Sequence, residues 1–210
     1  MILHGYWRSG TSYRTRIALN LKGLAYEQQP VDLRTGAQKS EAFIALNPQG
    51  LVPALEVGNV VLTQSPAILE WLEETYPQPA LLPADSQARA VVRAMSALIG
   101  CDIHPLNNLR VLKAIKALGA DEGATEAWTQ GWIDDGFSAL EAMVTAHGAG
   151  WCYGDKPTLA DCYLLPQIYS ARRFNVEMSR YPRLCAIETR ANSHVAFEQA
   201  HPDQQPDADV

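Results

Sequence analysis

The chain has 210 residues, of which 47% are hydrophobic, and a formal net charge of −6. This length can bury one large core or two modest ones, and the acidic balance argues against nucleic acid as a partner. The four cysteines form no C-x-x-C pair and no metal-ligand spacing, which indicates reduced thiols. The apolar stretch at the start of the sequence is too short for the core of a signal peptide, and no apolar run is long enough to span a membrane. We therefore expect a cytoplasmic protein without a membrane partner.

The first part of the chain alternates predicted strands with predicted helices. We expect strands at 2–7, 26–33, 54–57 and 60–63, and helices after the turn 9–12 to about residue 22, at 38–46 and at 65–76. Gly58-Asn59 is a hairpin signal between the last two strands. The order strand–helix–strand, helix, strand–strand–helix predicts a compact α/β unit.

A Pro-rich connector at 77–85 is expected to separate this unit from a helical one. Apolar residues recur at helical spacing over 86–118, where Pro105 should kink or divide the helix, and over 126–147. Thr158 and Asp161 form a capping-box-like start for another helix. The predicted domains are therefore residues 1–78 and 85–210, with a polar tail from His201 that we expect to be loosely ordered.

Two short motifs predict a site for a small acidic peptide. Pro53 precedes an apolar strand, where a cis bond would make a tight turn and leave the N–H and C=O groups of Val52 free for an extended ligand. Gln64-Ser65 stands before Pro66, so Ser65 is predicted to be the N-cap of a helix. The N–H groups at such a helix start suit a carboxylate.

Residues 1–26 carry the cations Arg8, Arg14, Arg16 and Lys22 and no acidic residue. This cluster predicts a local electropositive site for an anion in an otherwise acidic protein. The alternative for Arg14 and Lys22 is a solvated charge on the surface of a helix. The sequence leaves both interpretations open.

These features together resemble the cytosolic glutathione transferases over essentially the whole chain. The resemblance lies in Val52-Pro53, Gln64-Ser65 and the segment from Thr158 to Asp161, and the segments 6–19, 36–38, 46–49 and 103–112 resemble the zeta class. Gly10-Thr11 departs from that class, which usually has Ser-Cys at this place. The resemblance implies a thioredoxin-like α/β N-terminal domain, an all-α C-terminal domain and a homodimer.

The zeta class includes glutathione-dependent isomerases of maleylpyruvate and maleylacetoacetate, and those of maleylpyruvate resemble this chain most. The resemblance implies glutathione as the cofactor and a small dicarboxylate keto-acid as the substrate. The implied reaction is cis–trans isomerisation of maleylpyruvate to fumarylpyruvate by reversible thiolate addition. Isomerisation of maleylacetoacetate, a glutathione-conjugating transferase and a non-catalytic member of the fold are the alternatives.

The resemblance also implies roles for individual residues. Ser9 would donate a hydrogen bond to the glutathione thiolate beside a helix N-terminus, and Thr11 competes for this role. Ser9 as a simple helix cap is the alternative. The residues implied in glutathione binding are Ser9 and Thr11 at the sulfur, Gln38 and Gln49 at the glycine end, Val52 and Pro53 at the cysteinyl backbone, Gln64 and Ser65 at the γ-glutamyl end, and His104 and Asn108.

Three arginines, Arg8, Arg110 and Arg173, are the candidate ligands of the substrate carboxylates, because a guanidinium pairs with a carboxylate through two parallel hydrogen bonds. Arg8 is also a catalytic candidate because it precedes Ser9. His104 is predicted to lie in the same site. A solvated helix residue at Gln38, a helix histidine at His104 and a surface arginine at Arg173 are the simpler interpretations of these positions.

Overall fold

The computed structural model describes residues 1–209, which form two compact units. Unit 1 comprises Met1–Leu81 together with the segment that begins at Asn192, and unit 2 comprises Leu82–Ala191. The division after Leu81 falls inside the Pro-rich connector that we expected to separate two domains. The C-terminal segment belongs to unit 1, however, whereas we expected it within a helical domain over 85–210.

Unit 1 is built on a four-stranded sheet with the order β2-β1-β3-β4, formed by β1 (Ile2–Gly5), β2 (Glu27–Pro30), β3 (Ala54–Val57) and β4 (Val60–Thr63). Strand β1 runs parallel to β2 and antiparallel to β3, and β3 pairs antiparallel with β4. The hairpin predicted at Gly58 is confirmed, with the positive φ that glycine tolerates. The first two strands are shorter than predicted, because their pairing ends with the hydrogen bond from the Val31 N–H to the Gly5 carbonyl, and the Ser9 N–H then closes a turn on the carbonyl of Tyr6.

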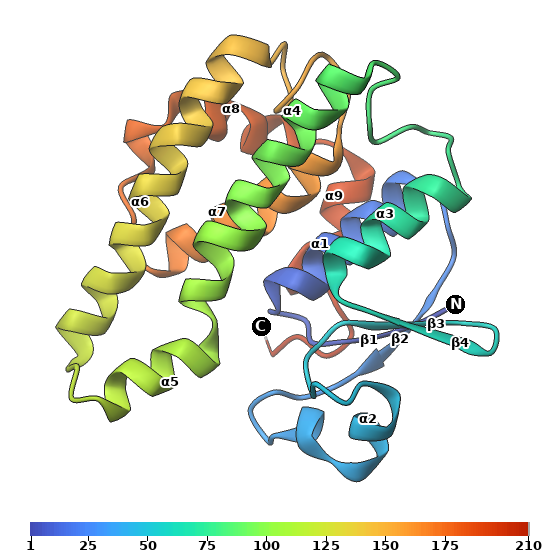
Figure 1. The fold of residues 1–210 in the computed structure, drawn as a ribbon, viewed down its shortest axis with the longest axis vertical. Helices are drawn as coiled ribbons and strands as arrows, with labels where there is room; N and C mark the ends of the chain where they lie inside the picture. The colour runs from blue at the N-terminus through green and yellow to red at the C-terminus, as the bar shows by residue number, and fades with distance from the viewer. Residues whose placement is uncertain (210) are drawn as a thin grey trace. The chain divides into compact units, whose positions relative to one another are not determined.

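The helices of unit 1 cover both faces of this sheet (Figure 1). Helices α1 (Gly10–Leu21) and α3 (Ser65–Thr75) lie on one face, and α2 (Glu41–Leu46) lies on the other. Phe43 of α2 joins a buried apolar cluster with Val31 and Ala54. The helix predicted over 38–46 is divided, because Ser40 is extended and caps α2 by accepting a hydrogen bond from the Phe43 N–H.

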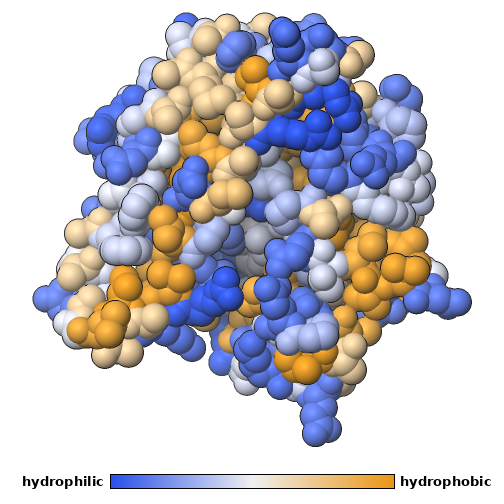
Figure 2. Space-filling view, viewed as in Figure 1, coloured by the Kyte–Doolittle hydropathy of each residue, from blue (hydrophilic) through white to orange (hydrophobic). Residues whose placement is uncertain are grey.

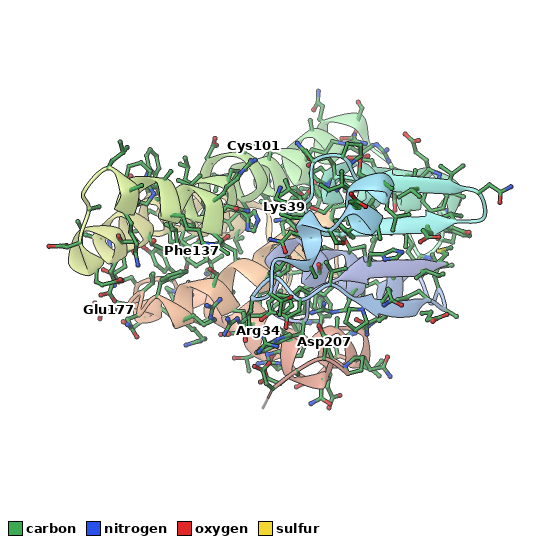
Figure 3. All side chains as sticks on the ribbon, turned by 90° about the horizontal axis from the view of Figure 1, so that it is seen from below. Arg34, Lys39, Cys101, Phe137, Glu177 and Asp207 are labelled. Atoms are coloured by element: carbon green, nitrogen blue, oxygen red, sulfur yellow. The ribbon has the colours of Figure 1, made fainter. Side chains whose placement is uncertain are left out.

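The C-terminal segment packs against unit 1, which corrects both the domain expectation and the expected loose tail. Helix α9 (Val195–Ala200) packs on α1, where the Arg16 Nε donates to the carbonyl of Ala200 at 3.0 Å. Gln205 is buried, and its side chain accepts from Gln28 at 2.7 Å. Further along, the tail that carries Asp207 lies beside the loop of Arg34, which pairs with Asp209 (Figure 3). These long-range hydrogen bonds could not be read from the local composition.

Unit 2 is helical, with α4 (Ser86–Ala97), η2 (Leu98–Ile103), η3 (His104–Asn107), α5 (Leu109–Ala117), α6 (Glu122–His147), α7 (Leu159–Arg173), η4 (Met178–Arg180) and α8 (Pro182–Ala191). The predicted break at Pro105 is confirmed, since a π-helical segment and a 3-10 segment separate α4 from α5. Helix α6 begins earlier than predicted because Asp121 caps it, accepting from the Ala124 N–H at 2.7 Å. None of the helices within residues 1–209 is long and apolar enough to cross a membrane.

The predicted capping interaction at the start of α7 is confirmed. Asp161 Oδ2 accepts from the N–H and the hydroxyl of Thr158 at 2.8 and 2.9 Å. Asp161 Oδ1 accepts from the N–H of Cys152 at 2.8 Å, which ties the preceding loop to the same carboxylate. Burial raises the pKa of Asp161, and these hydrogen bonds oppose that rise.

Candidate functional site

The N-terminus of α1 brings three of the predicted residues together. Ser9 is its N-cap, and Ser9 Oγ lies 2.9 Å from Thr11 Oγ1. Thr11 Oγ1 in turn donates to the carbonyl oxygen of Val52 at 2.9 Å. Because a carbonyl can only accept, the Thr11 proton is engaged there and Ser9 is the donor to Thr11. Both protons are thus engaged, and the Ser9 proton is the one that can turn from Thr11 toward a ligand at the helix start without releasing the Val52 carbonyl.

The Val52-Pro53 bond is cis, as the sequence predicted. Our expectation that both backbone groups of Val52 are free is wrong for the carbonyl, which accepts from Thr11. The N–H of Val52 has no hydrogen-bond partner within residues 1–209, so it can donate to an extended peptide. Pro53 itself carries no N–H and leads directly into β3.

The start of α3 differs from the prediction, because Gln64 and not Ser65 is the N-cap. Gln64 has a φ of 67°, a strained value for a residue other than glycine, and its side chain forms no capping hydrogen bond. Ser65 is the first helical residue, and its Oγ accepts from Arg14 Nη1 at 3.2 Å. The Ser65 hydroxyl is thus held by α1, and the first N–H groups of α3 lack a side-chain cap. An uncapped helix start suits an anion.

Three further polar residues of unit 1 are Gln38 and Lys39, in the 3-10 segment η1 (Ala37–Lys39), and Gln49, in the loop after α2. Gln64 Nε2 donates to Gln49 Oε1, so the structure brings together two residues that the resemblance assigned to opposite ends of glutathione. Lys39, labelled in Figure 3, donates to the Gln49 carbonyl at 3.2 Å and adds a cation that was not among the residues predicted from the sequence. The Gln38 Oε1 atom is buried without a hydrogen-bond partner in the described chain.

These features fit the groups of glutathione. The unpartnered Val52 N–H suits a peptide backbone, and the uncapped start of α3 suits a carboxylate. Lys39 offers a second positive charge, and the buried Gln38 oxygen can accept from a ligand N–H. The Ser9 hydroxyl lies at the positive end of α1, where a thiolate is favoured over a thiol.

The basic cluster of the first 26 residues divides into one accessible cation and three buried ones. Arg8 is half-buried, lies 5.2 Å from the centre of the Trp7 ring, and forms no ion pair with a carboxylate of the described chain. Arg14, Arg16 and Lys22 are at most 6% exposed, so the alternative of solvated helix charges is wrong. Lys22 Nζ donates to Glu73 and to the carbonyls of Tyr76 and Pro79. Arg16 donates to the carbonyls of Trp7 and Ala200. Of the cluster, Arg8 alone is exposed enough to meet a substrate.

The remaining predicted residues lie in unit 2. His104 begins the 3-10 segment η3, and Asn108 caps α5 by accepting from the N–H of Arg110 at 3.1 Å. Arg110 is exposed. Asn107 was not singled out from the sequence, yet both polar atoms of its amide are buried without a partner in the described chain. A buried amide without a partner is uncommon, which makes Asn107 a further polar candidate in this segment.

Arg173, at the end of α7, lines a cavity of about 400 Å³ within unit 2. The cavity is formed by Leu109, Leu112, Lys113, Lys116, Glu122, Thr125, Glu126, Arg173 and Phe174. Arg173 lies 5.7 Å from the centre of the Phe174 ring, and Leu109 is 51% exposed. Figure 2 shows apolar side chains gathered over this end of α5 and α6. The structure therefore places Arg173 beside the helix that carries Arg110.

Comparison with known proteins identifies the family of this site. Residues 8–75 match the model of the glutathione S-transferase N-terminal domain. A maleylacetoacetate isomerase of Pseudomonas aeruginosa is 50% identical over 99% of this chain and 98% of its own length.

Two solved structures cover the whole fold. The holo structure of a maleylpyruvate isomerase, described as a bacterial zeta-class glutathione transferase, has 54% identity and a TM-score of 0.97, covering 99% of this chain and 100% of its own. A maleylacetoacetate isomerase of Methylobacterium extorquens, solved with malonate and glutathione, has 36% identity and a TM-score of 0.94, covering 100% of both chains. With full-length relatives at this identity, the chain belongs to the zeta class of the glutathione transferase family.

Proposed function

We propose that this protein is a glutathione-dependent cis–trans isomerase that converts maleylpyruvate to fumarylpyruvate. The proposal rests on two residues that are neighbours in the chain. Arg8 is a cation without an acidic partner in the described chain, and the hydroxyl proton of Ser9 can turn to a ligand. An isomerase of a dianionic substrate needs both a stabilised thiolate and a nearby cation. The full-length similarity to a maleylpyruvate isomerase supports the same activity.

The residues of unit 1 would bind glutathione and stabilise its sulfur. When bound, glutathione supplies a thiolate that adds reversibly to the cis double bond, so that the bond can rotate before the thiol leaves. Ser9 donates a hydrogen bond at the sulfur, and the N-terminus of α1 adds positive potential there. The Val52 N–H pairs with the cysteinyl backbone, and the start of α3 with Gln64 and Ser65 holds the γ-glutamyl carboxylate. Gln38, Gln49 and Lys39 complete the binding of the peptide.

The substrate carboxylates would be held by arginines. Arg8 directly precedes Ser9 and carries a planar guanidinium that suits a carboxylate. Its charge also offsets the negative charge that develops on the substrate during the reaction. In unit 2 the candidates for binding the substrate carboxylates are Arg110 and Arg173, and His104 and Asn108 are further candidates for the site.

Maleylacetoacetate is the second candidate substrate, because its isomerases are also full-length relatives at up to 50% identity. The two substrates differ by one methylene, which a pocket distinguishes by only about 1–3 kcal/mol. We also propose a cytoplasmic homodimer, as the family resemblance implies. The four cysteines are free thiols, in keeping with a reducing compartment.

The test is an isomerase assay on maleylpyruvate and maleylacetoacetate with and without added glutathione, and a conjugation assay with a chloronitroaromatic electrophile. We expect turnover only with glutathione and no loss of free thiol, because glutathione is regenerated. The higher kcat/KM of the two keto-acids identifies the preferred substrate. Full turnover after exhaustive removal of glutathione, or stoichiometric consumption of thiol, would contradict the proposal.

A further inference from the structure

Arg14 connects α1 to the start of α3. It lies in α1, one turn after Gly10, and is 2% exposed. Helix α1 packs against α3, and Arg14 Nη1 donates to Ser65 Oγ at 3.2 Å. The same helix carries Ser9 at its N-cap, so one rigid element holds both the proposed thiolate donor and the proposed γ-glutamyl site.

The chemistry of this contact determines where the Ser65 proton points. A guanidinium can only donate hydrogen bonds, so Ser65 Oγ is the acceptor from Arg14. The single proton of the Ser65 hydroxyl is then directed away from Arg14 and remains available for a ligand acceptor. A hydroxyl that accepts from a cation is also a stronger donor, because successive hydrogen bonds polarise one another.

The electrostatic effect acts in the same direction. Gln64 leaves the start of α3 without a side-chain cap, and its N–H groups already favour negative charge. Arg14 adds a permanent positive charge behind this helix start, buried where solvent screens it little. The other buried cations of α1 serve different groups, since Arg16 donates to the carbonyls of Trp7 and Ala200 and Lys22 pairs with Glu73.

We propose that Arg14 is a positioning residue for glutathione: it orients and polarises the Ser65 hydroxyl so that this group donates to the γ-glutamyl α-carboxylate. This inference rests on the proposed function. Arg14 acts through Ser65 and does not touch the reacting atoms. Its removal should therefore weaken glutathione binding while leaving the chemical step nearly unchanged at saturating glutathione.

The test measures the Kd of glutathione by calorimetry for the wild type, Arg14→Met, Arg14→Lys, Ser65→Ala and the double variant Arg14→Met/Ser65→Ala. We expect Arg14→Met to raise Kd roughly 10- to 100-fold, the range for a lost hydrogen bond to a charged group. In the Ser65→Ala background, Arg14→Met should raise the Kd of glutathione less than about 3-fold, because the two residues act as one unit. Arg14→Lys should recover part of the affinity that Arg14→Met loses. The kcat of both Arg14 variants at saturating glutathione should stay within about 2-fold of the wild type.

A second ligand separates positioning from a general structural role. In γ-aminobutyryl-cysteinyl-glycine the γ-glutamyl α-carboxylate is absent, so its Kd should change less than about 3-fold in Arg14→Met. The matched control is Arg16→Met, which also removes a buried guanidinium of α1 and should leave the Kd of glutathione within about 3-fold. Equal losses for both ligands, or additive losses in the double variant, would overturn the inference and leave the proposed function intact. Failure of the wild type to bind glutathione would overturn both.

Discussion

The side-chain hydroxyl of Thr11 donates to the backbone carbonyl oxygen of Val52, 2.9 Å away. This bond ties the first turn of α1 to the residue before Pro53, across 41 positions of the chain. It also gives the two competing hydroxyls different tasks, because the Thr11 proton is engaged while Ser9 donates only to Thr11 and can turn to a ligand. The geometry therefore favours Ser9 as the thiolate donor and Thr11 as the residue that holds the Val52 backbone.

We expect Ser9→Ala to raise the apparent pKa of the bound glutathione thiol and to lower kcat about 10- to 100-fold, as for a lost hydrogen bond to a charged group. Its KM for glutathione should change little. Thr11→Ala should instead raise that KM, because the Val52 backbone loses its tether, and should leave the thiol pKa nearly unchanged. The measurement is the pH dependence of thiolate absorbance and of kcat. If Thr11→Ala shifts the thiol pKa and Ser9→Ala does not, the roles are reversed.

Arg8→Leu should reduce kcat/KM for maleylpyruvate by about 100-fold or more, because a substrate carboxylate then lacks its cation. The same variant should lose little activity toward a chloronitroaromatic electrophile, which has no carboxylate. Arg8→Lys should recover only part of the activity, since an ammonium keeps the charge without the planar fork. Assays of all three proteins on both substrates at saturating glutathione check this. Equal losses on the two substrates would mean that Arg8 supports the fold or the thiolate.

Lys22→Met should lower the free energy of unfolding by about 3–5 kcal/mol, because it removes one member of the buried ion pair between Lys22 and Glu73. The double variant Lys22→Met/Glu73→Gln should regain part of this loss, since a neutral amide oxygen can still accept from the Leu81 N–H. Urea unfolding measures both. The control is Lys116→Met, which removes an exposed ion pair with Glu122 and should cost less than about 1 kcal/mol. Similar losses in the two single variants would contradict the buried position of Lys22.

Thiol reactivity should follow burial. Cys101 is exposed, whereas Cys152 and Cys162 are fully buried. Burial raises the pKa of Cys152 well above its usual value and also raises the pKa of Cys185, so the reactive thiolate fraction of both is smaller at any given pH. With a disulfide reagent at pH 8 we expect fast labelling of Cys101, slower labelling of Cys185, and labelling of the other two only in denaturant. Cys101→Ser should remove the fast phase, and rapid native labelling of Cys152 would contradict the structure.

Local sequence signals determined several elements of this protein. The hairpin strands 54–57 and 60–63 have the predicted bounds, because Gly58 supplies the positive φ of the turn between two short, largely apolar runs. Pro105 divides the long helical stretch because it lacks the N–H that the helix ladder needs. Ser9 caps α1, and Thr158 and Asp161 form the capping box of α7, since both caps depend on groups within three residues. Together with the family motifs, these signals were sufficient to recognise the fold.

Contacts between distant segments decided the rest. The sequence left solvated surface charges as the alternative for Arg14 and Lys22, but these two side chains are buried, where they bind Ser65 and Glu73. Ser65 does not have its predicted capping role, because it is the first helical residue of α3 and Gln64 takes the N-cap position; its hydroxyl instead accepts from Arg14. The polar C-terminal segment joined unit 1 through the groups of Gln28 and Arg16. In each case the partner lies tens of residues away, and no local propensity or periodicity encodes which polar group will meet it in the folded chain.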